Sequence, residues 1–303
     1  MYPNQRNRRL RQSPAIRQLV SESQLTVNDM MLPLFVTEGS QVKEPISAMP
    51  GCYRLSLDLL QEEVKSVSDM GIKALLLFVM VDDALKDNKG TEALNPEGLM
   101  QRAVRKVKTT TPEMVVMTDV ALDPYSSYGH DGIVEKGKIL NDPTVEVLAQ
   151  MALSHAQAGA DFVAPSDMMD GRIQKIRTVL ESAGLTDTGI MSYSAKYASA
   201  FYGPFREVLD SDPGFGDKKT YQMDPANRLE ALTETLRDIE EGADMVMVKP
   251  GLAYLDIIRD IRENVEVPIA AYQVSGEYAM LKAAADKGWL DHDAVMMEQL
   301  LAF

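Results

Sequence analysis

One sequence motif occurs three times: the end of a predicted helix, a glycine, and then a short apolar strand. It reads SDMGIKALLLFV ending at Val79, AQAGADFVAPSD ending at Asp167 and EEGADMVMVKPG ending at Gly251. Each glycine stands where a helix commonly ends in a left-handed conformation. The strand that follows is a continuous apolar run, which is typical of a parallel sheet covered on both faces. The sequence therefore predicts a repeated αβ unit.

Extending the search predicts seven strands, near 30–36, 72–79, 114–120, 161–167, 189–195, 244–250 and 267–275. An open doubly wound sheet and a closed (β/α)8 barrel both fit such a series. No G-x-G-x-x-G motif follows the first strand, which disfavours the dinucleotide-binding form of the open sheet. Several strands end in polar residues, as in barrels whose active sites lie at the C-terminal strand ends. We therefore predict an α/β fold of the (β/α)8 TIM-barrel type, with the eighth strand absent from this chain.

Composition narrows the classes of function. The 303 residues carry a formal net charge of −14, which excludes a generally basic nucleic-acid binder. Cys52 is the single cysteine, so it can form neither an internal disulfide nor a cysteine zinc cluster, and this favours a reducing cytoplasm. No stretch approaches the roughly 18 consecutive apolar residues that a membrane span needs, so we expect no membrane association.

The two ends of the chain differ from the middle. The first 21 residues contain no acid and five arginines: Arg6, Arg8, Arg9, Arg11 and Arg17. We interpret residues 1–25 as an arm that contacts the acidic surface of a neighbouring copy, and residues 26–303 as the catalytic barrel. A flexible terminus and a transit peptide are the alternatives. Asp291 to Phe303 is predicted to form an amphipathic helix that needs a partner.

Two lysines stand out among the polar residues at the predicted strand ends. Lys196 lies in MSYSAKYAS and Lys249 in MVMVKPG, and both neighbour apolar strand residues. Burial and a second cation nearby both lower the pKa of a lysine, which frees its amine to attack a carbonyl carbon. Alternatively, each lysine reaches solvent or pairs with a carboxylate such as Asp119. Ser166 and Ser275 end two further strands.

Two loops add charged groups to this edge of the sheet. Thr118 to Gly132 concentrates Asp119, Asp123, His130 and Asp131. These hard oxygen ligands suit magnesium better than zinc, although a solvated loop without metal explains them equally well. Residues 201–219 contain three cations, Arg206, Lys218 and Lys219, which suggest capture of a substrate carboxylate. The alternative is an ordinary surface turn.

Several motifs together resemble the porphobilinogen synthase family, also called 5-aminolevulinate dehydratase. They are MSYSAKYASAFYGPFR, PSDMMDGR, YQMDPAN, MVKPGLAYLD and YQVSGEYAM. The resemblance implies a (β/α)8 barrel whose N-terminal arm wraps a neighbouring subunit, usually in a homo-octamer. It also implies the condensation of two 5-aminolevulinate molecules to porphobilinogen, with loss of two waters, in haem and chlorophyll biosynthesis.

The resemblance assigns roles by motif. Lys249 would form one Schiff base with substrate and Lys196 the second, while Asp119 and Ser166 would move protons and hold a substrate amine. Arg206 and Lys218 would grip one substrate carboxylate, and Ser275 would bind the other; all these residues stand in the matching motifs.

Two departures from the family pattern matter. Many members carry three zinc-binding cysteines where this chain has Ala121, Asp123 and Asp131. The chain therefore resembles the magnesium-responsive branch, in which Glu234 would contribute to an allosteric Mg²⁺ site, and no zinc is expected. Whether Asp123 and Asp131 also hold a cation is left open.

The second departure is at the C-terminus. Family members continue past the position of Phe303 into a strand, with a tyrosine that helps bind a substrate carboxylate, and a final helix. Without these the barrel would have unpaired strand edges, so the resemblance implies a shortened sequence that is inactive as given. A class I aldolase-type lyase, which needs one Schiff-base lysine, and a non-catalytic scaffold are the alternative functions.

Overall fold

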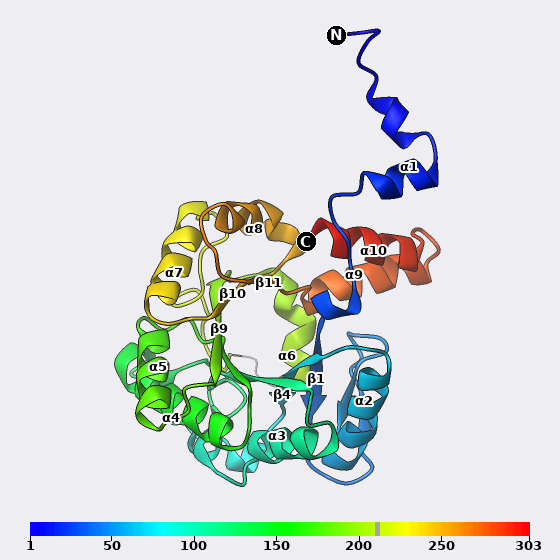
Figure 1. Cartoon of the computed structure of the whole chain (residues 1–303). Helices are drawn as coiled ribbons and strands as arrows, with labels where there is room; N and C mark the ends of the chain where they lie inside the picture. Colours follow the sequence, from blue (N-terminus) through cyan, green and yellow to red (C-terminus); the bar gives the residue numbers. More distant parts are fainter. Residues whose placement is uncertain (210–212) are drawn as a thin grey trace.

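A curled, mostly parallel sheet forms the centre of the molecule, and most helices lie around its outside (Figure 1). The computed structural model describes residues 1–209 and 213–303, without the side chains of Arg206, Glu207 and Leu209. Seven parallel strands lie side by side in chain order: β1 (Met31–Val36), β4 (Ala74–Val79), β5 (Val115–Val120), β8 (Phe162–Pro165), β9 (Gly189–Lys196), β10 (Met245–Lys249) and β11 (Ile269–Ala271). All seven predicted strands are present, but the prediction that the last one ends at Ser275 is wrong: β11 ends at Ala271, and Ser275 begins the helix that follows.

The helices follow the strands as the repeated αβ unit predicts. They are α2 (Leu57–Asp69), α3 (Leu99–Thr110), α4 (Asn141–Gln157), α5 (Arg172–Ser182), α6 (Gly203–Leu209), α7 (Arg228–Glu240), α8 (Leu255–Arg262), α9 (Ser275–Asp286) and α10 (His292–Ala302). The expected C-terminal helix is α10, and the Asp291 carboxylate caps it by accepting the Ala294 N–H at 2.9 Å. Among the described residues, no helix has both the length and the apolar character to cross a membrane.

Alternation along the strands divides the core into two parts. Side chains such as Leu75, Leu77 and Val116 point outward and pack under the helices. Their neighbours Phe78 and Met117 belong to a separate, aromatic-rich cluster on the inner face. Because both faces of the sheet are covered, its strands are apolar throughout, which explains why the sequence showed them as continuous runs.

Four short strands were not predicted. β2 (Lys43–Pro45) and β3 (Tyr53–Leu55) extend the sheet beyond β1, and β2 runs antiparallel to β3. β6 (Ile133–Glu135) and β7 (Lys138–Leu140) form a separate hairpin, whose turn residues Lys136 and Gly137 both have positive φ. Strands of three residues carry too little periodicity to be recognised in a sequence.

The sheet is open in the described part of the chain. Its end strands are β11 and β2, and each pairs with one neighbour. The curled parallel sheet is consistent with the predicted barrel type, and the absent eighth strand stays a prediction.

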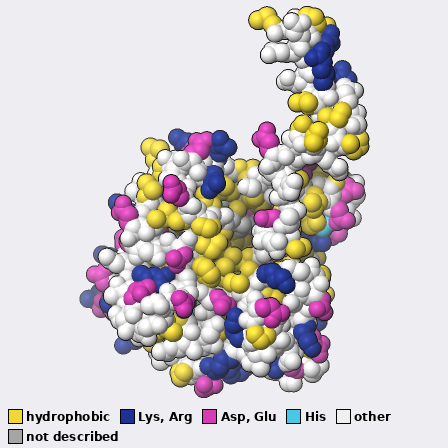
Figure 2. Space-filling view, in the orientation of Figure 1, with side chains coloured by type: hydrophobic (Ala, Val, Ile, Leu, Met, Phe, Trp, Pro, Cys, Tyr) yellow, Lys and Arg dark blue, Asp and Glu magenta, His cyan; other side chains and the backbone are white. Residues whose placement is uncertain are grey.

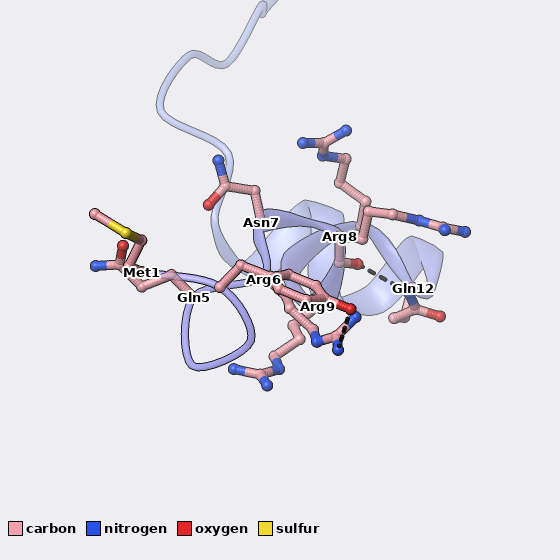
Figure 3. A pocket seen from close by; sticks show the side chains of 9 residues that line it. Met1, Gln5, Arg6, Asn7, Arg8, Arg9 and Gln12 are labelled. Atoms are coloured by element: carbon pink, nitrogen blue, oxygen red, sulfur yellow. Dashed lines mark hydrogen bonds between the residues drawn. The ribbon is translucent and has the colours of Figure 1, made fainter.

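The N-terminal arm extends away from the sheet and its helices (Figure 1). It contains a 3-10 turn over Asn7–Arg11 and α1 (Pro14–Leu19), and none of the residues in these two elements is buried. A hollow of about 740 Å³ lies entirely among residues 1–12 (Figure 3). The residues that line this hollow form hydrogen bonds with one another, such as the one that Gln12 Nε2 donates to the Arg8 carbonyl at 2.9 Å. The arm's contact with a second copy, and the division at residues 25 and 26, stay predictions.

Candidate active site

A bulge in β9 brings the two lysines onto the same face of the sheet. Val246 lies opposite Ser192, but Val248 lies opposite Ala195, so β9 holds one extra residue between these pairs. In a regular strand, side chains alternate between the two faces, so Tyr193 and Lys196, three residues apart, would point to opposite faces. The extra residue in β9 shifts this alternation by one position, so that both side chains point to the same face. Lys196 therefore pairs in register with Lys249 at the C-terminal ends of β9 and β10.

Lys249 lies in a cage of aromatic rings. Its Nζ is 4.6 to 5.3 Å from four ring centroids, those of Tyr193, Tyr202, Phe205 and Tyr272. Ammonium groups are attracted to such ring faces, but the side chain is also deprived of water. Burial, reinforced by the charge of Lys196, lowers the pKa of Lys249 to about 7. A substantial fraction of this amine is therefore uncharged and nucleophilic near neutral pH.

Lys196 has mainly polar partners, and one aromatic ring, that of Tyr193, has its centroid 5.9 Å from the Lys196 Nζ. Its Nζ donates to the backbone carbonyl of Ser166 and to Asp131 Oδ2, the latter at 3.2 Å. The two lysines therefore differ in environment: Lys249 is enclosed mainly by rings, and Lys196 is paired with a carboxylate. This difference favours Lys249 as the more reactive amine in the free protein.

Asp119, at the end of β5, is the carboxyl group suited to proton transfer. Burial, with a contribution from Asp123, raises its pKa to about 7, while a hydrogen bond with the Ser166 side chain opposes the shift. Asp119 Oδ1 and the Tyr193 hydroxyl are both buried and have no hydrogen-bond partner among the described residues. Unpaired buried polar atoms beside two lysines indicate a place for a polar ligand.

Three charged groups from the two predicted loops form a buried chain. Lys218 Nζ lies 2.6 Å from Asp131 Oδ1 and 3.2 Å from Asp123 Oδ2. Burial alone would raise the pKa of Asp131, but the ammonium groups of Lys196 and Lys218 outweigh it and lower that pKa. Asp131 is therefore a carboxylate held between two cations, and it links the 201–219 loop to the lysine pair.

The structure gives contacts for one of the other two predicted substrate-binding residues, Ser275, and only the backbone position of the second, Arg206. Ser275 begins α9, is buried, and donates its hydroxyl to the Phe201 carbonyl at 3.4 Å. Arg206 lies on α6, but its side chain is outside the described residues. The roles assigned to both stay predictions.

Glu234 lies apart from the lysines, on α7. It lines a cavity of about 830 Å³ together with Asp170, and that lining includes neither Lys196 nor Lys249. Burial and the neighbouring Asp238 raise the pKa of Glu234, and its carboxylate pairs with Arg237 at 3.2 Å. Within the described residues, no group of three or more His, Cys, Asp or Glu side chains has the arrangement of a metal site.

Sequence reasoning did not identify the aromatic cage. Tyr193, Tyr202, Phe205 and Tyr272 come from three parts of the chain, and aromatic residues in or beside strands read as ordinary core. Figure 2 shows the central hollow of the molecule, which hydrophobic side chains line. The useful signal was Tyr193, three residues before Lys196, but only the bulge places both on one face.

Comparison with known proteins adds independent support. The family model described as delta-aminolevulinic acid dehydratase matches residues 4–303. The chain is 51% identical to the delta-aminolevulinic acid dehydratase of Halalkalibacterium halodurans, covering 98% of this chain and 90% of that one. It is 56% identical to the chloroplastic enzyme of Physcomitrium patens, with 98% and 69% covered.

A solved structure is similar throughout. The Toxoplasma gondii delta-aminolevulinic acid dehydratase, in complex with the reaction product porphobilinogen, is 52% identical, with a TM-score of 0.97 over 99% of this chain and 86% of that one. Fold, sequence and strand-end chemistry therefore agree, and the chain belongs to the delta-aminolevulinic acid dehydratase family.

Proposed function

We propose that this chain condenses two molecules of 5-aminolevulinate to porphobilinogen with the loss of two waters, a lyase reaction of tetrapyrrole biosynthesis leading to haem and chlorophylls. Its family membership and the product in the Toxoplasma gondii complex support this activity. The observation that carries the mechanism is the register pairing of two buried lysines, one of which has its pKa lowered to about 7.

Each lysine is proposed to form a Schiff base with one substrate molecule. The uncharged Lys249 amine adds to the keto carbon, and the carbinolamine then loses its hydroxyl group, with one proton, as water. The resulting iminium withdraws electrons from the adjacent carbon, which can then lose a proton and form the new carbon–carbon bond. Lys196 binds the second molecule in the same way after it transfers its proton to a neighbouring base.

Asp119 and Ser166 are proposed to supply the proton transfers. A carboxyl group with a pKa near 7 can donate a proton to the departing hydroxyl and take one from the substrate carbon at the same pH. The Asp119 Oδ1 atom, which has no partner among the described side chains, is free to receive the substrate amine.

The cationic residues are proposed to hold the substrate carboxylates. Lys218 already faces two carboxylates at the mouth of the lysine pair, so an incoming carboxylate would exchange with one of them. Arg206 would act with Lys218, and Ser275 would bind the second carboxylate. We propose a (β/α)8 barrel as the full architecture, in which an eighth strand pairs with β11, whose second edge has no partner among the described residues.

Magnesium is proposed as the metal ion, at Glu234 rather than between the lysines. Mg²⁺ is commonly bound by one or two carboxylates while it keeps several waters, which suits Glu234 with Asp170 in the same cavity. The ion would neutralise these acidic groups and stabilise α7. Asp123 and Asp131 face ammonium groups, which repel a second cation, so we assign them to charge pairing.

We propose no zinc site, because the positions of the family's cysteines hold Ala121, Asp123 and Asp131. We also propose a homo-oligomer of octamer type, with the basic arm of one copy on the acidic surface of the next, in a reducing cytoplasm. No nucleic acid or membrane partner is proposed.

A colorimetric assay for porphobilinogen tests the function. The purified full-length protein, with 5-aminolevulinate and Mg²⁺, is expected to form product, and its Lys249→Met variant is expected to form none. Product formation that persists in the variant would refute the assigned mechanism. Trapping of a single lysine by another carbonyl substrate, without porphobilinogen, would favour the aldolase-type alternative.

A further inference from the structure

A buried histidine, His130, and a half-buried tyrosine, Tyr221, lie outside the assigned chemistry and connect the loop at residues 213–222 to the loop that follows β5. His130 Nε2 lies 3.0 Å from the Phe215 carbonyl oxygen, and its Nδ1 lies 3.1 Å from the Tyr221 hydroxyl. The same hydroxyl accepts the backbone N–H of Asp131 at 3.3 Å. His130 is only 1% exposed, so water does not replace these partners.

The chemistry of the partners fixes the direction of each hydrogen bond. A carbonyl oxygen only accepts, so Nε2 must carry the proton that it donates to Phe215. In the neutral imidazole, Nδ1 then has a lone pair, and the Tyr221 hydroxyl donates to it. The Tyr221 oxygen is left to accept the Asp131 N–H. All these groups are therefore satisfied by one tautomer of His130 and one orientation of Tyr221.

These hydrogen bonds end at the backbone N–H of Asp131, the residue whose carboxylate pairs with both Lys196 and Lys218. Asp131 presents Oδ2 to Lys196 and Oδ1 to Lys218, so a small rotation of its backbone would break one of the two pairs. Tyr221 and Lys218 belong to the same loop. The hydroxyl of Tyr221 therefore sets the position of Asp131 relative to the loop that carries Lys218.

We propose that His130 and Tyr221 are positioning residues, which hold the 213–222 loop against the β5 loop and orient Asp131 between the two lysines. Ring contacts support the same arrangement, with the Phe215 ring centroid 4.7 Å from that of His130 and 5.9 Å from that of Tyr128. Neither positioning residue touches the reacting atoms. The catalytic consequence rests on the proposed condensation, whereas the structural consequence does not.

The test compares Tyr221→Phe with Tyr128→Phe. Both variants lose one phenolic oxygen and keep the ring. Tyr221 contacts His130, whereas Tyr128 contacts Phe215, is 41% exposed, and its hydroxyl has no hydrogen bond among the described residues. In Tyr221→Phe, amide hydrogen exchange of Asp131 and of residues 213–222 is expected to accelerate about 5- to 10-fold, as for the loss of a buried hydrogen bond. In Tyr128→Phe, exchange is expected to stay unchanged.

Kinetics and a double variant separate positioning from general destabilisation. Tyr221→Phe is expected to raise KM and to lower kcat/KM about 10-fold, while Tyr128→Phe keeps both. His130→Gln keeps an amide N–H that can donate to Phe215 but removes the imidazole Nδ1 that accepts from Tyr221, so the double variant with Tyr221→Phe should be no worse than the more impaired single variant.

Equal exchange rates in Tyr221→Phe and Tyr128→Phe, or additive losses in the double variant, would overturn the proposal. Exchange needs no turnover, so this result is distinct from failure of the condensation itself. If His130→Gln does not fold, the comparison of the two tyrosine variants still decides the matter.

Discussion

At the scale of single residues, the site depends on two groups whose proton affinities are shifted toward each other. Burial lowers the pKa of Lys249 and raises that of Asp119, and both reach about 7. Near neutral pH, one group can therefore give up a proton while the other holds one, which covalent carbonyl chemistry with proton transfer requires.

The buried ammonium of Lys249 predicts a pH-dependent stability. Its folded-state pKa of about 7 lies below the roughly 10.4 of an exposed lysine, so between these values the unfolded chain binds more protons. The destabilisation is therefore complete below pH 7 and fades as the pH rises toward 10. We expect Lys249→Met to be more stable than the parent chain near pH 6, and this advantage to shrink near pH 9. Urea unfolding at both values measures it, and a constant advantage would contradict the assigned pKa.

Removal of the Asp119 carboxyl group tests its role in proton transfer. Asp119→Asn keeps the size and polarity of the side chain but cannot exchange a proton, so kcat is expected to fall about 100-fold or more with little change in KM. Steady-state kinetics provide the measurement, and Asp123→Asn is a neighbouring control that loses a carboxylate outside the lysine pair. A fall in both variants by the same factor would indicate loss of charge instead of loss of proton transfer.

At the scale of elements, a buried ion pair joins α5, α7 and β9. Arg172 Nη1 donates to Asp238 Oδ1 at 2.7 Å, and the Ser192 hydroxyl donates to Asp238 Oδ2 at 2.6 Å. Both charged side chains are 2% exposed. This network lies next to the bulge of β9 and therefore supports the strand that ends at Lys196.

Replacing one partner of this ion pair should destabilise the fold more than replacing both partners with apolar residues. Arg172→Met leaves the Asp238 carboxylate buried without its cation, and we expect it to lower the free energy of unfolding by about 3–5 kcal/mol. The double variant Arg172→Met with Asp238→Leu should recover most of the loss. Urea unfolding at neutral pH measures both variants, and a double variant as unstable as the single one would contradict this interpretation.

The strands were predictable from sequence and the bulge was not. Strands covered on both faces, such as Ala74–Val79, leave a continuous apolar run that distinguishes them from helices. The extra residue between Ser192 and Ala195 has no sequence signal, because it is defined by pairing with β10. Lys249 was identified from the cost of burying a lysine, whereas its four rings come together only through tertiary packing.

At the scale of the whole molecule, the cavity at α7 lies outside the lysine pair, so an ion there can act on activity only through the fold. Glu234→Gln is expected to abolish stimulation by Mg²⁺ and to keep the activity measured without metal. Glu230→Gln, which changes a second carboxylate lining the same cavity, is the matched control and should keep the stimulation. Titration of porphobilinogen formation with Mg²⁺ measures both. Full stimulation of Glu234→Gln would move the magnesium site elsewhere.

Reduction with borohydride in the presence of 5-aminolevulinate tests the central claim most directly, because it converts a Schiff base into a stable amine on the lysine that formed it. Peptide mass spectrometry is expected to show substrate-derived mass on Lys249 first and on Lys196 at higher substrate concentration. Omission of borohydride should leave both lysines unmodified. A folded, active protein in which neither lysine gains mass would contradict the account.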